Sequence, residues 1–251
     1  MTLPHIDPSK ENESDIQRRY YAETASEYDD MHLESDWQHS FALHLLTGYI
    51  EFYKITSVLD VGAGTGRTMT WLKQKFPALT VKGVEPVEAL RERGYAKGLL
   101  PEDLVDGNGY ELPFQENSFE LVCEFAVLHH VREPNRMIRE MNRVASRAVA
   151  ISDCNFVGQG SFPLRLLKLG LFLAGLWPVA DWMKTRGKGY TISEGDGLAY
   201  SYSVYQGLGE LKKRWRSIRF TTAHGRPDSL FGPIATAGHL FLFASDADAP
   251  P

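Results

Sequence analysis

The stretch Val58-Leu59-Asp60-Val61-Gly62-Ala63-Gly64-Thr65-Gly66 decides the fold, because a short apolar run ends in three alternating glycines. Such a run is typical of a strand buried in a parallel sheet. Glycine lets the backbone turn tightly and approach a ligand with no Cβ in the way. The segment 65–76 that follows has a helical pattern. The stretch therefore predicts a ligand-binding loop between a strand and a helix.

Similar apolar runs recur along the chain and predict further strands at 81–85, 119–125, 147–153, 217–224 and 239–245. Helical patterns separate or precede them at 15–28, 41–52, 87–97, 133–145 and 204–215. This alternation predicts a doubly wound, Rossmann-like α/β fold with a seven-stranded, mostly parallel sheet. We expect a single domain over 1–251, with an N-terminal arm and cover helices over 1–54 and a helical insertion over 155–203, after the fifth strand.

The composition is that of an ordinary globular protein, with 43% hydrophobic and 24% charged residues among 251. The net charge of −5 provides no protein-wide positive field, which disfavours a nucleic-acid partner. Cys123 and Cys154 lack the spacing of a zinc knuckle or a disulfide framework. The first 15 residues have no signal-peptide pattern, so a cytoplasmic location is expected.

The glycine pattern separates two kinds of cofactor site. A nicotinamide-binding loop reads G-x-G-x-x-G, and its third glycine would fall on Arg67. The chain instead has G-x-G-x-G preceded by Asp60. Together with later motifs, this pattern resembles the class I S-adenosylmethionine-dependent methyltransferases, in particular the type 11 group that includes quinone-pathway and small-molecule enzymes. The resemblance covers roughly residues 20–153.

The resemblance implies a set of contacts for the methionine and ribose part of S-adenosylmethionine. The glycine loop would supply Asp60, Gly62, Ala63, Gly64 and Gly66. At the end of the next strand, Glu85-Pro86 places an acid where the family binds both ribose hydroxyls. A carboxylate suits this role because its two oxygens can each accept a hydroxyl proton. Glu85 could also serve only as a favourable acid at the start of a helix.

The resemblance continues with the adenine side of the pocket. The block 107–114, GNGYELPF, resembles the family's G-D-A-x-x-L-P-F, so Asn108 and Gly109 would border the adenine. An amide oxygen can accept the hydrogen bond that the usual aspartate accepts. Asp106 is a rival for that role, and Asn108 could be a plain turn residue. In the run 118–131, SFELVCEFAVLHHV, the strand end carrying Phe125 and Ala126 would border the adenine or the sulfonium.

An N-terminal cover and a base complete the expected site. The run 19–29, RYYAETASEYD, resembles the segment that closes over the cofactor in the family, with Tyr20 and Tyr28 as candidates, although core packing is an alternative. Methyl transfer from a sulfonium is an in-line displacement that needs alignment and requires no metal. If the acceptor must lose a proton, His129 is the candidate base. It could also only pack the adjoining loop.

Other side chains are candidates for the acceptor side. Asp153 and Asn155 follow a parallel strand, whose carboxyl end is where ligands collect. Only composition suggests the aromatic run Tyr200-Ser201-Tyr202 for the acceptor side. Cys123 is expected to be a small buried strand residue and not a nucleophile.

The segment 162–183 is apolar on almost every side. It is long enough to span a bilayer, but Arg165, Lys168, Pro178 and Asp181 oppose insertion. A lid that forms an apolar acceptor pocket, a core helix and a helix on a membrane surface remain open. The basic run 184–188 could meet an anionic group or be a solvated loop.

These patterns predict an S-adenosylmethionine-dependent methyltransferase that acts on a small hydrophobic or aromatic molecule. One alternative is a non-catalytic S-adenosylmethionine-binding protein of the same fold, because a fold and a pocket do not establish chemistry. The other is a nicotinamide-dependent oxidoreductase, which Arg67 disfavours. The oligomeric state is not predicted.

Overall fold

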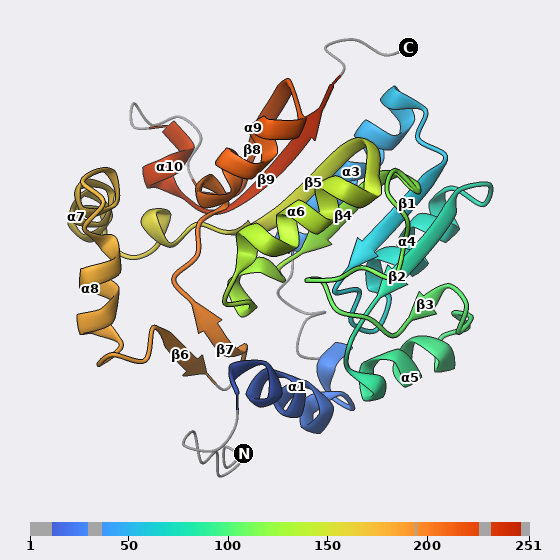
Figure 1. Ribbon diagram of the computed structural model, residues 1–251, viewed down its shortest axis with the longest axis horizontal. Helices are drawn as coiled ribbons and strands as arrows, with labels where there is room; N and C mark the ends of the chain where they lie inside the picture. Colours follow the sequence, from blue (N-terminus) through green and yellow to red (C-terminus); the bar gives the residue numbers. More distant parts are fainter. Residues whose placement is uncertain (1–11, 30–36, 194, 226–231, 247–251) are drawn as a thin grey trace.

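A computed structural model describes residues 12–29, 37–193, 195–225 and 232–246. At its centre lies a seven-stranded sheet with the order β3-β2-β1-β4-β5-β9-β8 (Figure 1). The first five strands are parallel, and β9 runs antiparallel to both β5 and β8. This confirms the mostly parallel Rossmann-like sheet. The strands are β1 (Ser57–Val61), β2 (Thr80–Val84), β3 (Leu104–Val105), β4 (Phe119–Phe125), β5 (Ala145–Cys154), β8 (Ser217–Gly225) and β9 (Ala237–Ser245).

Helices cover both faces of the sheet because its central strands are apolar on both faces. On one face, Val58 and Phe243 belong to a core built with the helices α3 (Trp37–Tyr53) and α4 (Arg67–Lys75). On the other face, Leu59 and Leu242 belong to a core built with α6 (Pro134–Val144) and α9 (Leu208–Arg214). Neighbouring residues of one strand thus point to opposite layers, as the period of two requires.

The strand register gathers the site at one edge of the sheet. Val61 at the end of β1 pairs with Val84 at the end of β2, and Asp60 pairs with Cys123 of β4. Because these strands are parallel, the loops that follow them all leave from the same carboxyl edge. The helix α5 (Glu88–Ala96) follows β2, so its first turn also begins there.

Some elements were not predicted from the sequence. The strand β3 has only two residues, too few to produce a period. The strands β6 (Tyr190–Ser193) and β7 (Gly197–Tyr200) form a hairpin outside the main sheet. This hairpin lies beside the N-terminal helix α1 (Glu13–Thr24), which is shorter than the expected 15–28 (Figure 1).

The apolar segment 162–183 forms two helices, α7 (Phe162–Leu173) and α8 (Trp177–Lys184), at one end of the molecule (Figure 1). Neither helix has a buried residue. The idea of a buried core helix is therefore wrong. The short helix α10 (Gly232–Thr236) contacts α7. Among the described residues, no helix is long and apolar enough to cross a membrane.

Candidate active site

The glycine loop after β1 adopts the backbone that its sequence predicts. Gly62, Gly64 and Gly66 have φ angles of +77°, +55° and +75°, which only glycine adopts readily. A Cβ on Gly64 would lie 3.1 Å from the hydroxyl of Tyr28, so the narrow passage between the loop and that ring would close. Gly66 has a different role, because it is the N-cap of α4 and packs against Leu99. It lines neither of the two clefts described below, unlike the other two glycines.

Glu85 is held in place by the loop that it faces. Its Oε2 accepts a hydrogen bond from the backbone N–H of Gly64, and its Oε1 accepts one from Val87, each at 2.9 Å. Burial raises the pKa of Glu85 to about 7, although the two hydrogen bonds act to lower it. Burial, and then the charge of Glu85, raise the pKa of Asp60 to about 7 as well. A carboxylate oxygen has two lone pairs, so Glu85 retains the capacity to accept two further hydroxyls.

The side of the cleft that was expected to border the adenine is a turn whose exposed residue, Asn108, faces the cleft. Asn108 lines the cleft, while its Oδ1 accepts a hydrogen bond from the backbone N–H of Tyr110 at 2.9 Å. It is thus both a turn residue and a cleft residue, with one acceptor lone pair remaining. Asp106, the rival, lies outside the cleft and pairs with Arg91 at 2.8 Å. Position therefore favours Asn108 over Asp106 as the residue that would contact the adenine.

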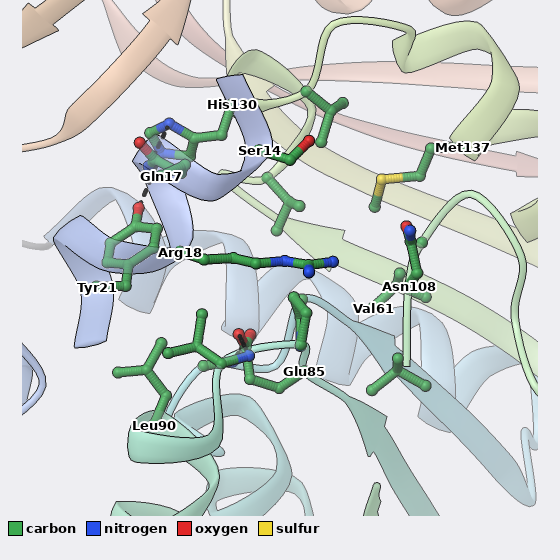
Figure 2. A pocket seen from close by; sticks show the side chains of 18 of the residues that line it. Ser14, Gln17, Arg18, Tyr21, Val61, Glu85, Leu90, Asn108, His130 and Met137 are labelled. Carbon is green, nitrogen blue, oxygen red and sulfur yellow. Dashed lines mark hydrogen bonds between the residues drawn. The ribbon is translucent and has the colours of Figure 1, made fainter. Parts of the chain in front are cut away.

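The N-terminal cover is present, but one of its predicted tyrosines points elsewhere. Tyr28 and Tyr21 line the cleft, whereas Tyr20 is buried and lines neither cleft. For Tyr20, the structure therefore supports the alternative that this side chain packs in the core. On α1, Arg18 extends across the cleft between Glu85 and Asn108 (Figure 2). Neither Tyr21 nor Arg18 was predicted, because the family resemblance gave no register for the cover helix.

Together these elements enclose a first cleft with an empty volume of about 920 Å³, part of it open to solvent. Its walls fit a ribose-containing cofactor, because an anchored carboxylate with free lone pairs faces a loop where a Cβ would intrude. The predicted residues that line this cleft are Tyr28, Gly62, Gly64, Glu85, Pro86, Asn108, Gly109, Phe125 and Ala126.

A second cleft adjoins the first and has a different lining. Gly62, Phe125 and Ala126 border both clefts, and the predicted residues Asp60 and Ala63 line the second. Its other walls carry polar side chains from segments far apart in the sequence, namely Gln38, His39, Arg67, His129, Asp196 and His239, together with His130, which also lines the first cleft. The empty volume is about 1340 Å³, part of it open to solvent. The second cleft is thus a polar cavity at the carboxyl edge of the sheet.

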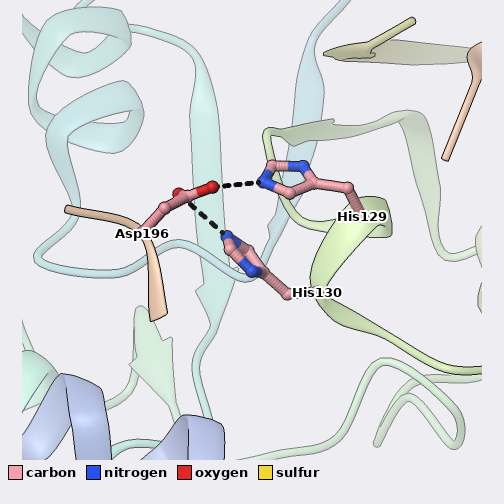
Figure 3. A group of neighbouring side chains, drawn as sticks. All are labelled: His129, His130 and Asp196. Atoms are coloured by element: carbon pink, nitrogen blue, oxygen red, sulfur yellow. Dashed lines mark ion pairs between the residues drawn. The ribbon is translucent and has the colours of Figure 1, made fainter. Parts of the chain in front are cut away.

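Two histidines and an aspartate meet in this second cleft. The carboxylate of Asp196, on the turn of the β6–β7 hairpin, lies 3.4 Å from Nε2 of His129 and 3.4 Å from Nε2 of His130 (Figure 3). The Nδ1 of His130 lies 2.7 Å from the carbonyl oxygen of Leu198, which can only accept, so that nitrogen donates. The hydroxyl of Tyr21 lies 3.0 Å from Nε2 of the same ring. The hairpin and α1 thus converge on one histidine.

His129 is oriented by a buried carboxylate. Its Nδ1 lies 2.7 Å from Oδ1 of Asp153, whose Oδ2 accepts the backbone N–H of Leu128 at 2.8 Å. Burial alone would lower the pKa of His129, but the charges of Asp153 and Asp196 overcome it and raise this pKa to about 10. In turn, His129 holds the pKa of Asp153 below its ordinary value against the effect of burial. With Nδ1 committed to Asp153, Nε2 is the nitrogen that faces the cleft.

The turn that carries the histidines begins with a strained, exposed residue, Ala126, which closely follows a buried acid, Glu124. Ala126 has a φ of +59°, a conformation that is costly for a residue with a side chain and that clusters at functional sites. Glu124 is fully buried; its Oε2 accepts the backbone N–H of Val127 at 2.9 Å, while its Oε1 has no hydrogen-bond partner. Burial, and then the charge of Asp153, raise the pKa of Glu124 well above its usual value. Glu124 was not predicted as part of the site.

Several acceptor-side candidates have structural roles instead. Asn155 is fully buried and donates to the carbonyl oxygens of Ile234 and Ala237 at 2.8 Å, so its place near the acceptor is wrong. Tyr200 donates to Glu13, Ser201 donates to Asp181, and Tyr202 is buried. Cys123 is a buried strand residue, as expected.

The insertion contributes less to the clefts than expected. Of 155–203, only Gly195 and Asp196 line either cleft, and no side chain of 162–183 does. These two clefts therefore give no support to the expected apolar acceptor pocket in that segment, which stays a prediction.

Comparison with known proteins agrees with this geometry. Residues 59–149 match a family described as a methyltransferase domain. The chain is 30% identical over 190 residues to the demethylmenaquinone methyltransferase of Staphylococcus aureus (strain JH9), covering 74% of this chain and 76% of that protein.

Solved structures share the fold at low sequence identity. A SAM-dependent methyltransferase from Thermotoga maritima superposes with a TM-score of 0.59 at 16% identity, covering 92% of this chain and all of that one (100%). Magnesium protoporphyrin IX methyltransferase from Synechocystis PCC 6803, with bound SAM, gives 0.59 at 14% identity, covering 95% and 99%.

Proposed function

The chain belongs to the class I S-adenosylmethionine-dependent methyltransferases, and on that premise we propose that it methylates a small molecule whose reacting end is polar and ionisable. S-adenosylmethionine is the cofactor. The first cleft would hold it, and the second cleft would hold the acceptor. The observation that carries this assignment is the His129–Asp153 pair, because the other ring nitrogen, Nε2, faces the second cleft and, among the described residues, meets there only the half-exposed carboxylate of Asp196.

Bound S-adenosylmethionine supplies a methyl group on a positively charged sulfur, which an acceptor atom displaces in line. The acceptor must arrive with an electron pair, so an acidic O–H or an activated C–H has to lose its proton. Nε2 of His129 accepts that proton, and Asp153 keeps the ring in the orientation and tautomer that expose Nε2. The products are the methylated acceptor, the demethylated cofactor and a proton that leaves through the open cleft.

The charge state of His129 sets a condition on this mechanism. With a pKa of about 10, the ring is protonated near pH 7 in the free protein. A positive charge in the adjoining cleft favours the neutral ring, and so does any displacement of Asp196 by the acceptor. Because Asp196 is 48% exposed at the tip of a hairpin turn, an acceptor can reach it directly from solvent. Asp196 thus holds the position that the ionisable acceptor group would take.

The acceptor class follows from the polar lining of the second cleft and from the relative. The similar Staphylococcus protein is a demethylmenaquinone methyltransferase, whose named substrate joins a quinone ring to an apolar remainder. We propose a reduced, hydroxylated ring of this kind as the acceptor. One ring hydroxyl would give its proton to His129, and the apolar remainder would lie outside the polar cleft.

The test is turnover with labelled S-adenosylmethionine and a panel of acceptors. The panel contains reduced demethylmenaquinone, simple dihydroxyarenes and small amines, and both the labelled acceptor and the demethylated cofactor are measured. We expect transfer to the hydroxylated rings and a rate that rises with pH. Transfer to none of them, with intact cofactor binding, would favour the non-catalytic binding protein.

A metal ion is the main competing explanation for the same cluster. The ligand atoms of His129, His130 and Asp196 lie within 4.8 Å of one another, which is close enough to hold an ion. Repeating the assay after dialysis against EDTA separates the two mechanisms. Unchanged turnover supports proton transfer to His129, whereas loss that is restored by a divalent cation contradicts it.

A further inference from the structure

The helices α7 and α8 form an exposed apolar surface that the mechanism does not use. Nine of the thirteen large hydrophobic side chains that are exposed in the described part of the chain lie between residues 162 and 183. Leu173, Met183 and Trp182 are 72%, 68% and 63% exposed. Water-soluble proteins rarely expose so many apolar side chains in one place, and such patches mark contact sites. We call this surface, residues 162–183, the apolar paddle.

The paddle is attached on one side and open on the other. Phe156, which follows β5, stacks on Trp177 with ring centroids 4.2 Å apart and meets Phe172 at 5.8 Å. Elsewhere on α7, Leu166 and Leu173 are seven residues apart, so they share one helical face. Both are exposed. The paddle thus has a fixed inner side and an apolar outer face.

The net charge of the paddle and of the few residues that flank it is opposite to that of the whole chain. Residues 160–190 contain a single acid, Asp181, which accepts a hydrogen bond from Ser201. They contain five basic residues: Arg165, Lys168, Lys184, Arg186 and Lys188. The whole chain has a net charge of −5. Basic groups are therefore concentrated around the one large apolar surface found in the described part of an acidic protein.

We propose that the apolar paddle docks on the surface of an anionic lipid bilayer. An apolar helix face bordered by Lys and Arg is the pattern that binds in the interfacial plane of a membrane. Each basic side chain near an anionic surface strengthens binding by roughly fivefold. Trp182 adds a ring of the type that concentrates at the membrane interface. The exposed leucines would enter the boundary between head groups and acyl chains.

Charge decides between a bilayer and a second copy of the chain. In a two-fold contact the same surface is used by both partners, so the basic residues of one paddle would face those of the other. Like charges placed opposite one another disfavour such an interface. An anionic bilayer satisfies both the apolar and the basic parts of the paddle. It is therefore the occupant that the surface fits.

Both segments that flank the paddle in the chain contribute to the second cleft. The paddle follows β5, whose Cys154 lines this cleft, and it precedes the β6–β7 hairpin, whose Asp196 does so too. Docking would therefore hold the clefts near the lipid surface. The docking itself rests on the surface alone, whereas its use in taking an acceptor with an apolar remainder from the membrane rests on the proposed function.

The test is co-sedimentation of the full chain with vesicles, which requires no turnover. Vesicles of phosphatidylcholine are compared with vesicles of phosphatidylcholine and phosphatidylglycerol, at low and high salt. We expect binding at least roughly tenfold stronger to the anionic vesicles, weakened by salt. The double variant Leu173→Glu/Trp182→Glu should lose roughly tenfold or more of this binding, because both side chains would resist burial.

Matched variants separate docking from general effects. Leu100→Glu changes a leucine that is 51% exposed outside the paddle and should bind as the wild type does. Arg186→Glu/Lys188→Glu should weaken binding to anionic vesicles more than Lys75→Glu/Lys212→Glu, which reverses the same number of exposed charges elsewhere. Thermal unfolding confirms that each variant is folded.

Two results would overturn the proposal. One is equal binding of wild type and paddle variants to anionic vesicles. The other is a dimer in sedimentation velocity that depends on Leu173 and does not bind vesicles. Activity on a water-soluble dihydroxyarene tests the proposed function separately, since the paddle variants should retain it.

Discussion

The two clefts of this protein share a border but are built differently. The first has one wall made of loops that directly follow β1, β2 and β4, and backbone N–H groups fix its central carboxylate, Glu85. The second is made of side chains brought from α3, the turn after β4, the β6–β7 hairpin and β9. The cleft proposed for the cofactor thus depends on backbone shape, whereas the cleft proposed for the acceptor depends on long-range packing and on charge.

This contrast predicts separable defects. Changes in the first cleft should weaken cofactor binding, and changes in the second should slow methyl transfer at saturating cofactor. Glu85 and His129 are the clearest pair, because each is buried and held by hydrogen bonds but they lie in different clefts.

The largest effect is expected for His129→Ala. Loss of the proton acceptor should slow transfer by roughly 10² to 10⁴-fold, because that is the usual contribution of a positioned base. Cofactor affinity, measured by calorimetry, should not change. His44→Ala, at an exposed histidine of α3, is the control. A parallel fall in affinity and rate would show that the two clefts are not independent.

Gly64→Val should weaken cofactor binding by about a hundredfold. A β-branched residue at a φ of +55° is strained, and its Cβ would meet the hydroxyl of Tyr28. Gly48→Val, at a helical glycine with no atom within 4 Å of its Cβ position, should bind normally. Equal affinities for the two variants would mean that the cofactor does not approach the loop.

Glu85→Gln should weaken cofactor binding by about tenfold, since a charged acceptor is worth roughly 1.5 to 3 kcal/mol. The folded pKa of about 7 adds a pH test: the ionised carboxylate accepts both hydroxyls, so affinity of the wild type should fall as pH drops through about 7. The variant should lack this fall. Asp106→Asn, outside the cleft, should retain it.

The smallest effect is expected for Asp196→Asn, which should shift the pH dependence of the transfer rate. Removing this carboxylate lowers the pKa of His129 from about 10, so the rising limb of the transfer rate should move to lower pH. The raised pKa also stabilises the fold: this contribution is complete below the unfolded value of 6.5 and is lost as pH rises through about 10. The variant should therefore unfold more easily near neutral pH. If the variant shows the same pH dependence of the transfer rate as the wild type, His129 is not the titrating base.

The sequence alone determined most of the fold. Strand and helix periods placed every main-sheet strand except the two-residue β3, and the apolar runs fixed which strands are buried. The predicted loop residues of the first cleft, such as Gly62, Gly64 and Glu85, could be placed because each follows its strand within a few positions. Their contacts with S-adenosylmethionine remain predictions. The register of α1 was misjudged, because two adjacent tyrosines, Tyr20 and Tyr21, differ only in the face on which they lie.

The tertiary structure decided what surrounds His129 and where the apolar segment lies. Asp196 is 67 positions from His129 along the chain, and only the β6–β7 hairpin brings them together. Likewise, the sequence showed that 162–183 is apolar but not whether it faces a core, a cleft or solvent. Local periodicity reports which residues avoid water, and it carries no information on which distant surface receives them. That surface is set by packing, which here left the apolar paddle exposed.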